Sequence, residues 1–288
     1  MVNIPTFGGT VSRINYTAHT ILITGASSGI GETFARTLAA RGSDLVLVAR
    51  RQDRLEALSA ELEAAYGIRA TAISADLASP TAGADLRSAV NARGLVITGV
   101  INNAGFGTFG PFLHEDPARL AQEIAVDVSA PVQLSREFLP DLIAADAGFL
   151  INVASMAAYN AIPRLAVYGA TKSFVLNFTI ALWAELRGTG VRVFVLSPGA
   201  TSTEFNDVVG TEDATAGARK RTPDQVVATA LAHLEARDPG PTVIDGAGNR
   251  LSAAIARFVS RRMLATMTER LTDPARRSDS REAVGAQR

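Results

Sequence analysis

Short segments of continuous hydrophobicity alternate along this chain with segments whose apolar residues recur every three or four positions. Continuous hydrophobicity is expected of strands buried on both faces of a sheet, and the wider spacing is helical. The alternation therefore predicts an α/β fold, with a parallel, doubly wound sheet of about seven strands and helices on both faces. The predicted strands span 20–24, 45–49, 70–74, 100–102, 148–153, 191–196 and 242–244, and the clearest helices span 32–40, 51–65, 118–139 and 173–186.

The two ends of the chain differ from this core. We interpret residues 19–272 as a single domain, preceded by an irregular arm over 1–18 and followed by a flexible, charged tail over 273–288. Residues 250–271 carry apolar side chains at helical spacing, flanked by arginines, and predict a C-terminal amphipathic helix. We expect this helix to dock on the body or on another subunit; contact with a membrane or an acyl chain is the alternative.

A polar segment over 202–221 interrupts the alternation of strands and helices. It follows a predicted strand and precedes Thr222, Pro223 and Gln225, which have the pattern of a helix start. Long loops at the carboxyl ends of parallel strands lie where ligands bind. We therefore expect this segment to cover a substrate, and a surface loop without such a role is the alternative.

The composition excludes several classes of function. The chain has 288 residues, 47% of them hydrophobic and 19% charged, and its formal net charge is zero, so no basic field is available for nucleic acid. It has no cysteine and three scattered histidines, so neither disulfides nor a metal site is expected. No apolar run reaches the roughly 18 residues of a membrane span, and residues 1–20 lack a signal-peptide pattern. We therefore expect a cytoplasmic protein.

A glycine-rich turn, TGASSGIG over 24–31, connects the first predicted strand to a helix. Its glycines allow a tight turn, and the helix N-terminus then offers free N–H groups to a pyrophosphate. In this strand–turn–helix context the turn predicts a dinucleotide site, although a plain connecting turn is the alternative. The candidate cofactor-binding residues here are Gly25, Ser27, Ser28, Gly29, Ile30 and Gly31.

Two arginines indicate which dinucleotide binds. An NAD site places an acidic residue at the end of the second strand, to hold the ribose 2′-hydroxyl. Here Asp44 precedes that strand, and its carboxyl end carries Arg50 and Arg51. A guanidinium can bind a 2′-phosphate through two hydrogen bonds, so the sequence favours NADP(H) over NAD(H). The alternative is that both arginines are the solvated start of the next helix.

A serine, a tyrosine and a lysine form the candidate catalytic group. Ser155 ends the fifth predicted strand, and Tyr168 and Lys172 lie four residues apart on the following helix, hence on one face. The lysine is conspicuous because the chain has 28 lysines and arginines, of which only Lys172 and Lys220 are lysines. Lysine provides a compact ammonium with a shiftable pKa, which arginine does not.

These motifs together resemble the short-chain dehydrogenase/reductase family, in its NADP-preferring type. The matching stretches are TGASSGIG (24–31), ADL (75–77), NNAG (102–105), Ser155, YGATK (168–172) and SPGATST (197–203), in order over residues 20–205. The resemblance implies a Rossmann-like sheet of seven strands, assembly into homodimers or homotetramers, and an adenine site bordered by Asp76 and Leu77. It also implies that the cofactor is lined by Asn102, Ala104, Gly105, Pro198, Gly199, Thr201 and Thr203, in addition to Tyr168 and Lys172.

The family's chemistry matches these residue types. A hydride moves between nicotinamide C4 and a carbonyl carbon, and Tyr168 exchanges a proton with the oxygen as general acid/base. Lys172 and the oxidised nicotinamide would lower the tyrosine pKa from near 10, and Ser155 would hold the oxygen. Asp127 stands where the family commonly has asparagine, so we regard it as a candidate proton-relay residue, or as a polar helix residue without functional effect.

The predicted substrate is a mostly apolar ketone, aldehyde or secondary alcohol. The candidate pocket residues are Phe106, Phe109, Met156 and Phe205, with no arginine placed to bind a carboxylate. Core packing is the alternative for several of them. Two other functions remain as alternatives: an NADP-binding redox-linked regulator without activity, and an epimerase or dehydratase of the related extended type, whose glycine turn and C-terminal domain differ.

Overall fold

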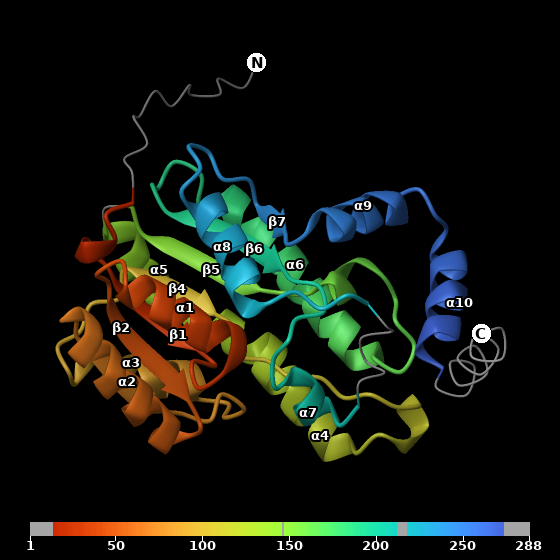
Figure 1. Cartoon of the computed structure of the whole chain (residues 1–288), viewed down its shortest axis with the longest axis horizontal. Coiled ribbons are helices and arrows are strands. Elements are labelled where there is room, and N and C mark those ends of the chain that lie inside the picture. The colour runs from red at the N-terminus through yellow and green to blue at the C-terminus, as the bar shows by residue number, and fades with distance from the viewer. Residues whose placement is uncertain (1–13, 146, 212–217, 274–288) are drawn as a thin grey trace, which may run out of the picture.

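The computed structural model describes residues 14–145, 147–211 and 218–273, and its centre is one seven-stranded sheet (Figure 1). The strand order is β3-β2-β1-β4-β5-β6-β7, and every neighbouring pair is parallel. The order reverses between β1 and β4, which is where open α/β sheets bind ligands. The strands are β1 (Thr20–Thr24), β2 (Asp44–Ala49), β3 (Ala70–Ser74), β4 (Gly99–Asn102), β5 (Phe149–Val153), β6 (Arg192–Ser197) and β7 (Thr242–Ile244), each within one residue of its predicted bounds.

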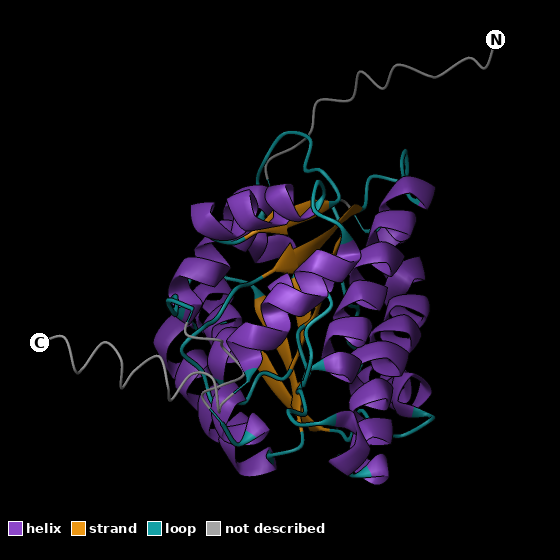
Figure 2. Ribbon diagram, turned by 90° about the vertical axis from the view of Figure 1, so that its right-hand side faces the viewer, coloured by secondary structure: helices purple, strands orange, loops and turns teal. Residues whose placement is uncertain are grey.

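Helices cover both faces of the sheet, as the sequence predicts (Figure 2). Successive residues of β1 point to opposite faces: Ile21 and Ile23 enter one hydrophobic core and Leu22 enters the other. The first core also contains Phe34 and Val226, and the second also contains residues of three helices of the opposite layer. The first layer is α1 (Gly29–Ala39), α2 (Gln52–Tyr66) and α8 (Pro223–Leu234), and the second is α3 (Ala82–Asn91), α5 (Ala130–Ala144) and α6 (Ala166–Glu185).

The helix predicted over 118–139 is interrupted. The structure has α4 (Pro117–Ile124), a π-helical turn (Ala125–Ser129) and then α5. In this turn the N–H of Ala130 bonds to the carbonyl of Ala125, five residues back. Pro131 comes next and has no N–H to give to the carbonyl of Asp127, so a regular helix would lose a hydrogen bond at this point. The irregular turn contains Asp127.

The C-terminal helix predicted over 250–271 is two helices, α9 (Ala247–Ala256) and α10 (Arg261–Thr272). Ser260 has an extended backbone and caps α10 by accepting a hydrogen bond from the N–H of Met263, so the chain turns between the helices. Both helices project from one end of the body (Figure 1). α10 contacts this body through Thr268, whose hydroxyl donates to the carbonyl of Ala161 at 2.9 Å.

Other predicted segments are described only in part. In the arm predicted over 1–18, residues 1–13 lie outside the described residues, and Tyr16–Ala18 forms a 3-10 turn. Residues 274–288 of the predicted tail also lie outside them. Among the residues that are described, no helix has both the length and the apolarity to cross a membrane.

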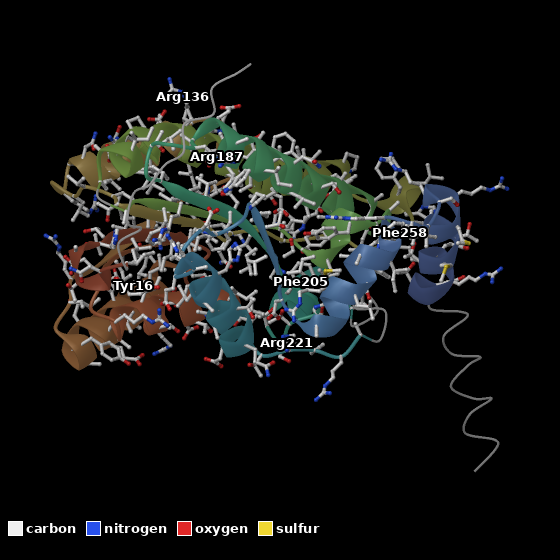
Figure 3. The ribbon with its side chains drawn as sticks, turned by 90° about the horizontal axis from the view of Figure 1, so that it is seen from above. Tyr16, Arg136, Arg187, Phe205, Arg221 and Phe258 are labelled. Carbon is white, nitrogen blue, oxygen red and sulfur yellow. The ribbon has the colours of Figure 1, made fainter. Side chains whose placement is uncertain are left out.

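The segment 202–221 is closed at its base, and its residues 212–217 lie outside the described ranges. The N–H of Ser202 donates to the carbonyl of Arg221, and the N–H of Arg221 donates to the carbonyl of Ala200, both at 2.9 Å. Within it, Phe205–Val209 forms the short helix α7. Phe205 and Arg221, labelled in Figure 3, belong to the two limbs of this loop.

Candidate active site

A cavity of about 550 Å³ lies at the carboxyl ends of the strands and collects most of the predicted site residues. It is lined from the β1–α1 turn through the segments that follow β2 to β6. Four predicted residues of the site are not part of the lining: Gly31, Asn102, Phe109 and Asp127. The predicted residues in the lining are Gly25, Ser27, Ser28, Gly29, Ile30, Arg50, Arg51, Asp76, Leu77, Ala104, Gly105, Phe106, Ser155, Met156, Tyr168, Lys172, Pro198, Gly199, Thr201, Thr203 and Phe205.

The glycine turn has the geometry of an anion cradle. Gly25 and Gly29 have φ of 66° and 58°, in the left-handed region that side chains other than glycine rarely adopt. A Cβ on Gly31 would collide with the carbonyl oxygen of Gly25, so Gly31 serves close packing of the helix start. α1 begins at Gly29, so its free N–H groups lie at the cavity wall. The turn therefore fits the pyrophosphate of a dinucleotide.

The asparagine pair after β4 differs from the expectation. Asn102 is buried beneath the cavity, where its amide donates to Asn152 Oδ1 at 2.8 Å. Asn103 lines the cavity in its place, and its amide donates to the carbonyl of Thr24 at 2.9 Å. Alternation along an extended strand explains the exchange, because neighbouring residues point in opposite directions. Asn102 is therefore a structural link between β4 and β5.

At the end of β2, Arg51 lies against the glycine turn. Its guanidinium donates to Ser27 Oγ and Ser28 Oγ, both at 3.0 Å from Nη2, and Nη1 pairs with Glu204 Oε2 at 2.9 Å. The second oxygen of Glu204 pairs with Arg54 Nη1 at 2.8 Å. Hydrogen bonds from both arginines lower the pKa of Glu204 to about 2. The carboxylate is thus held between two guanidinium groups beside the cofactor cradle.

The acidic residue nearest to β2 in sequence does not reach this site. Asp44 begins the strand, at the end opposite to Arg50 and Arg51. Its carboxylate accepts from the backbone N–H of Arg69 at 2.8 Å and pairs with the Arg69 guanidinium at 3.3 Å. This placement is consistent with the expectation that Asp44 does not bind the ribose.

Ser155 and Tyr168 meet at the centre of the cavity. Ser155 follows β5 and caps the 3-10 turn Met156–Tyr159, with its hydroxyl oxygen accepting from the N–H of Ala157 at 3.1 Å. Tyr168 lies in the first turn of α6, lines the cavity together with Ser155 and packs on the ring of Phe205 at 5.3 Å between centroids. The phenol is therefore oriented within the cavity by Phe205.

Lys172 lies one helical turn after Tyr168 and is almost fully buried. Its Nζ is 5.5 Å from the Tyr168 ring centroid and forms an ion pair of 3.0 Å with Asp127 Oδ2. The other oxygen of Asp127 accepts from the backbone N–H of Phe106 at 3.0 Å. A Cβ on Gly105 would lie 2.8 Å from the Lys172 Nζ, so only glycine allows this approach. Asp127 thus fixes the ammonium directly.

Burial dominates the electrostatics of these groups. It raises the pKa of Tyr168 above its usual value, although Lys172 and the Ser155 hydroxyl act in the opposite direction. Burial alone would lower the pKa of Lys172, but Asp127 and Tyr168 raise it. The ammonium is therefore held in its charged form. Lys172 acts on the tyrosine in the expected direction, yet in the protein alone burial outweighs it.

The opposite end of the cavity is mostly apolar. Of the predicted substrate residues, Phe106, Met156 and Phe205 line it, and α10 contributes Thr268 and Thr272. Phe109 lies outside the lining, in a part of the loop that Gly110 ties to Arg164 through a backbone hydrogen bond of 2.9 Å. The arginines in the lining are Arg50 and Arg51, at the cofactor end.

Sequence reasoning missed Asn103, Glu204 and the two threonines of α10 as lining residues. Asn103 stands beside the predicted Asn102. Assigning correctly to which side of the strand each asparagine points would have found it. Glu204 is the first acidic residue after SPGATST, but no local pattern reveals its pairing with Arg51 and Arg54. These contacts join residues about 150 positions apart, and only the fold brings them together.

Comparison with known proteins shows the family to which the chain belongs. The model of the short chain dehydrogenase family matches residues 19–214, more than half of the chain. The chain belongs to the short chain dehydrogenase family. A short-chain dehydrogenase from Sphingobium yanoikuyae, solved in complex with NADPH, is 33% identical with a TM-score of 0.74, and the match covers 83% of this chain and 93% of that one.

Two further relatives of this short chain dehydrogenase carry specific names. A bulky-bulky ketone specific alcohol dehydrogenase from Comamonas testosteroni is 28% identical with a TM-score of 0.70, covering 83% of this chain and 92% of that one. The 7beta-hydroxysteroid dehydrogenase of Collinsella aerofaciens is 32% identical over 182 residues, 63% of this chain and 68% of its own length. The matches span only 60% and 65% of the lengths of relatives from Pseudocercospora fijiensis and Danio rerio.

Proposed function

We propose that this short chain dehydrogenase is an NADP(H)-dependent oxidoreductase acting on CH–OH groups, which interconverts a ketone or aldehyde and the corresponding alcohol. The observation that carries the proposal is the position of Tyr168. It lies one turn from Lys172 and lines the same cavity as Ser155 and the glycine turn. A proton donor and an anion cradle that share one cavity suit hydride transfer coupled to proton transfer.

The side chains divide the chemistry of reduction between them. The bound nicotinamide cofactor supplies the hydride. Tyr168 gives its phenolic proton to the substrate oxygen as the carbonyl becomes an alcohol, and the reverse reaction returns that proton. Ser155 orients the substrate oxygen with its hydroxyl, whose oxygen is already fixed by the N–H of Ala157. Lys172 stabilises the phenolate that remains, because its ammonium stays charged beside Asp127.

The arginines at the end of β2 support a preference for NADP(H). Arg51 lies beside the glycine turn and already holds an anionic group, the carboxylate of Glu204. A 2′-phosphate would meet the same guanidinium, and Arg50 also lines the cavity. The relative from Sphingobium yanoikuyae was solved with NADPH. Gly25, Ser28 and Gly29 would hold the pyrophosphate, and Asp76 and Leu77 would border the adenine.

The substrate class follows from the apolar end of the cavity. Phe106, Met156 and Phe205 line the cavity with Tyr168, and the arginines of the lining, Arg50 and Arg51, follow β2 beside the glycine turn, which favours an uncharged carbonyl compound of moderate size. The names of the Comamonas and Collinsella relatives, a bulky ketone enzyme and a hydroxysteroid enzyme, agree with this class. We extend the proposal to a dimer or tetramer, as the family resemblance implies.

A panel of ketones and aldehydes tests the proposal, with absorbance recording the oxidation of NADPH and, separately, of NADH. We expect turnover with apolar ketones and a lower KM for NADPH than for NADH. Fluorescence titration of both cofactors gives their Kd values without any substrate. Tight binding of NADPH with no turnover across the panel would overturn the enzyme proposal in favour of an NADP-binding regulator. Equal Kd values for the two cofactors would overturn the NADP preference alone.

A further inference from the structure

A second buried carboxyl group, Glu123, lies beside the catalytic group and has no role in the mechanism above. Glu123 is on α4 and its side chain is shielded from solvent. Its Oε2 accepts two hydrogen bonds from Thr108, from the backbone N–H at 3.1 Å and from the hydroxyl at 2.8 Å. Its Oε1 is buried and has no hydrogen-bond partner among the described residues. An unpartnered buried carboxylate oxygen is costly and calls for a reason.

The position of Glu123 links it to Tyr168. Glu123 precedes Asp127 by four residues, and the two carboxyl groups hold alternate N–H groups of one loop, those of Thr108 and Phe106. Gly107 lies between these two anchors and against the phenol ring, since a Cβ on it would come 3.1 Å from Tyr168 Cδ2. Glu123 and Asp127 therefore clamp the loop that packs on the catalytic tyrosine.

The ionisable groups near Glu123 come from α6 and from α4 with the π turn that continues it. Asp127 lies on the π turn that continues α4, and Lys172 and Tyr168 lie on α6. Arg119, one turn earlier on α4, places its guanidinium 4.2 Å from the centre of the Phe106 ring. The loop itself contributes no ionisable side chain at 106–110. Burial raises the pKa of Glu123 to about 7; Asp127 also raises it, whereas Thr108 and Lys172 lower it.

We propose that Glu123 is a positioning residue of the catalytic centre, whose proton occupancy sets the local charge experienced by Tyr168 and Lys172. The proposal rests on the proposed role of Tyr168. An ionised Glu123 places a negative charge near the phenol and so keeps the proton on Tyr168. A protonated Glu123 removes that charge and favours the phenolate. Glu123 exchanges its proton with solvent only and passes none to the substrate.

The pH dependence of the rate in each direction should respond to this group with a definite sign. Reduction needs a protonated Tyr168, which the ionised Glu123 favours, and oxidation of an alcohol needs the phenolate, which the protonated Glu123 favours. Since Glu123 titrates around neutrality, its charge changes in the range where the enzyme works. The unpartnered oxygen is the atom that can take up the proton without losing the hydrogen bonds to Thr108.

Nuclear magnetic resonance of the full chain, labelled with ¹³C at glutamate carboxyl groups, tests the coupling without a substrate. Glu123→Gln assigns the Glu123 signal by its loss, and Thr108→Val assigns it by a selective shift if the first variant does not fold. We expect a glutamate that titrates near 7. Coupling is reciprocal, so Lys172→Met should raise this pKa and Asp127→Asn should lower it, each by about half a unit or more.

Lys220→Met is the matched control, because Lys220 is the only other lysine and is exposed. It should move the Glu123 signal by less than about 0.2 unit. The proposal is overturned if every glutamate titrates below about pH 5.5, or if neither Lys172→Met nor Asp127→Asn moves the signal beyond the control.

A kinetic experiment tests the effect of Glu123 on catalysis, with a substrate from the panel of ketones and aldehydes. The pH profile of kcat should show an inflection near 7 in the wild type that Glu123→Gln lacks, while NADPH binds both equally. Superimposable profiles would overturn the catalytic part of the proposal. If the panel gives no turnover, the enzyme proposal fails, and the resonance data still decide whether Glu123 is coupled to Lys172 and Asp127.

Discussion

Two groups of ion pairs flank the same cavity at nearly the same distances, and their surroundings differ. Lys172 and Asp127 are 3.0 Å apart, with side-chain exposures of 6% and 0%. Arg51 and Arg54 lie 2.9 and 2.8 Å from Glu204, and all three side chains are 40% to 46% exposed. Water screens the second group and leaves the first almost unscreened.

Because of this difference, the Lys172–Asp127 pair has a fixed geometry, whereas the anion bound by Arg51 and Arg54 can be exchanged for another. The buried ammonium has lost its water and depends on Asp127, so the pair holds one geometry. The exposed arginines can replace one anion by another at little cost, because water solvates whatever is released. A catalytic proton donor needs the first kind of environment, and a site that captures and releases a phosphate needs the second.

Tyr168→Phe gives the largest expected effect, because it removes the proton donor from the buried centre. We expect kcat to fall by about a thousandfold or more while the Kd for NADPH changes by less than about threefold. Turnover measured with a panel substrate, and fluorescence titration of NADPH, check both numbers. Turnover within about tenfold of the wild type would remove the tyrosine from the mechanism.

Asp127→Ala breaks the buried pair and should lower the free energy of unfolding by about 3 to 5 kcal/mol, because it leaves the buried ammonium of Lys172 without its counter-charge. Glu204→Ala breaks two exposed pairs and should cost less than about 1 kcal/mol. Urea denaturation measures both. Asp127→Asn is the control, since an amide can still accept from the N–H of Phe106 and should recover part of the loss. Equal losses at the two sites would refute the comparison.

Glu123, a buried group, makes stability depend on pH between about 4.5 and 7. Its pKa is about 7 in the fold and near 4.5 in the unfolded chain, so the fold binds the extra proton between these values. Stability should therefore fall as pH rises from about 4.5 to 7, by up to about 3 kcal/mol from this group. Urea midpoints of the wild type and Glu123→Gln should converge at low pH in this range and separate at pH 7, with the variant more stable there. Parallel curves would show that Glu123 does not titrate in this range.

Arg51→Ala should weaken NADPH binding by about 10- to 100-fold and leave NADH binding unchanged within about twofold, because it removes one charged donor of the proposed phosphate site. Fluorescence titration of NADPH and of NADH, at low and at high salt, measures both effects. Arg69→Ala is the control, an arginine that pairs with Asp44 at the far end of β2. A similar loss for both cofactors would assign Arg51 to the pyrophosphate or to the fold.

Glu204→Gln should give the smallest effect. Removing the carboxylate that competes with the 2′-phosphate for Arg51 should tighten NADPH binding by about two- to fivefold, and the gain should shrink at high salt. NADH should show no such gain, because it lacks the phosphate. Weaker NADPH binding would mean that Glu204 orients the arginines instead of competing for them.

Predictions from local pattern succeeded where a feature is encoded by neighbours in sequence. The seven strands were found because continuous hydrophobicity marks strands covered on both faces, and the glycine turn because its conformation requires glycine. Predictions from local pattern were less accurate where packing between distant segments determines the structure. The helix over 118–139 is interrupted at the π turn next to Pro131, and the helix over 250–271 is divided at Ser260. Asn103 lines the cavity and Asn102 does not, because the motif alone does not show to which side of the strand each side chain points.

The sequence by itself determined the parallel sheet, the cradle at Gly25 and Gly29, and the spacing that puts Tyr168 and Lys172 on one helix face. Periodicity and local backbone preference act over a few residues, so they can be read directly from the chain. Only the tertiary structure decided which groups are buried together. It placed Asp127 against Lys172, Glu123 within the electrostatic reach of both, and Glu204 between two arginines. Charge and pKa depend on distance and on exclusion of water, and neither follows from order along the chain.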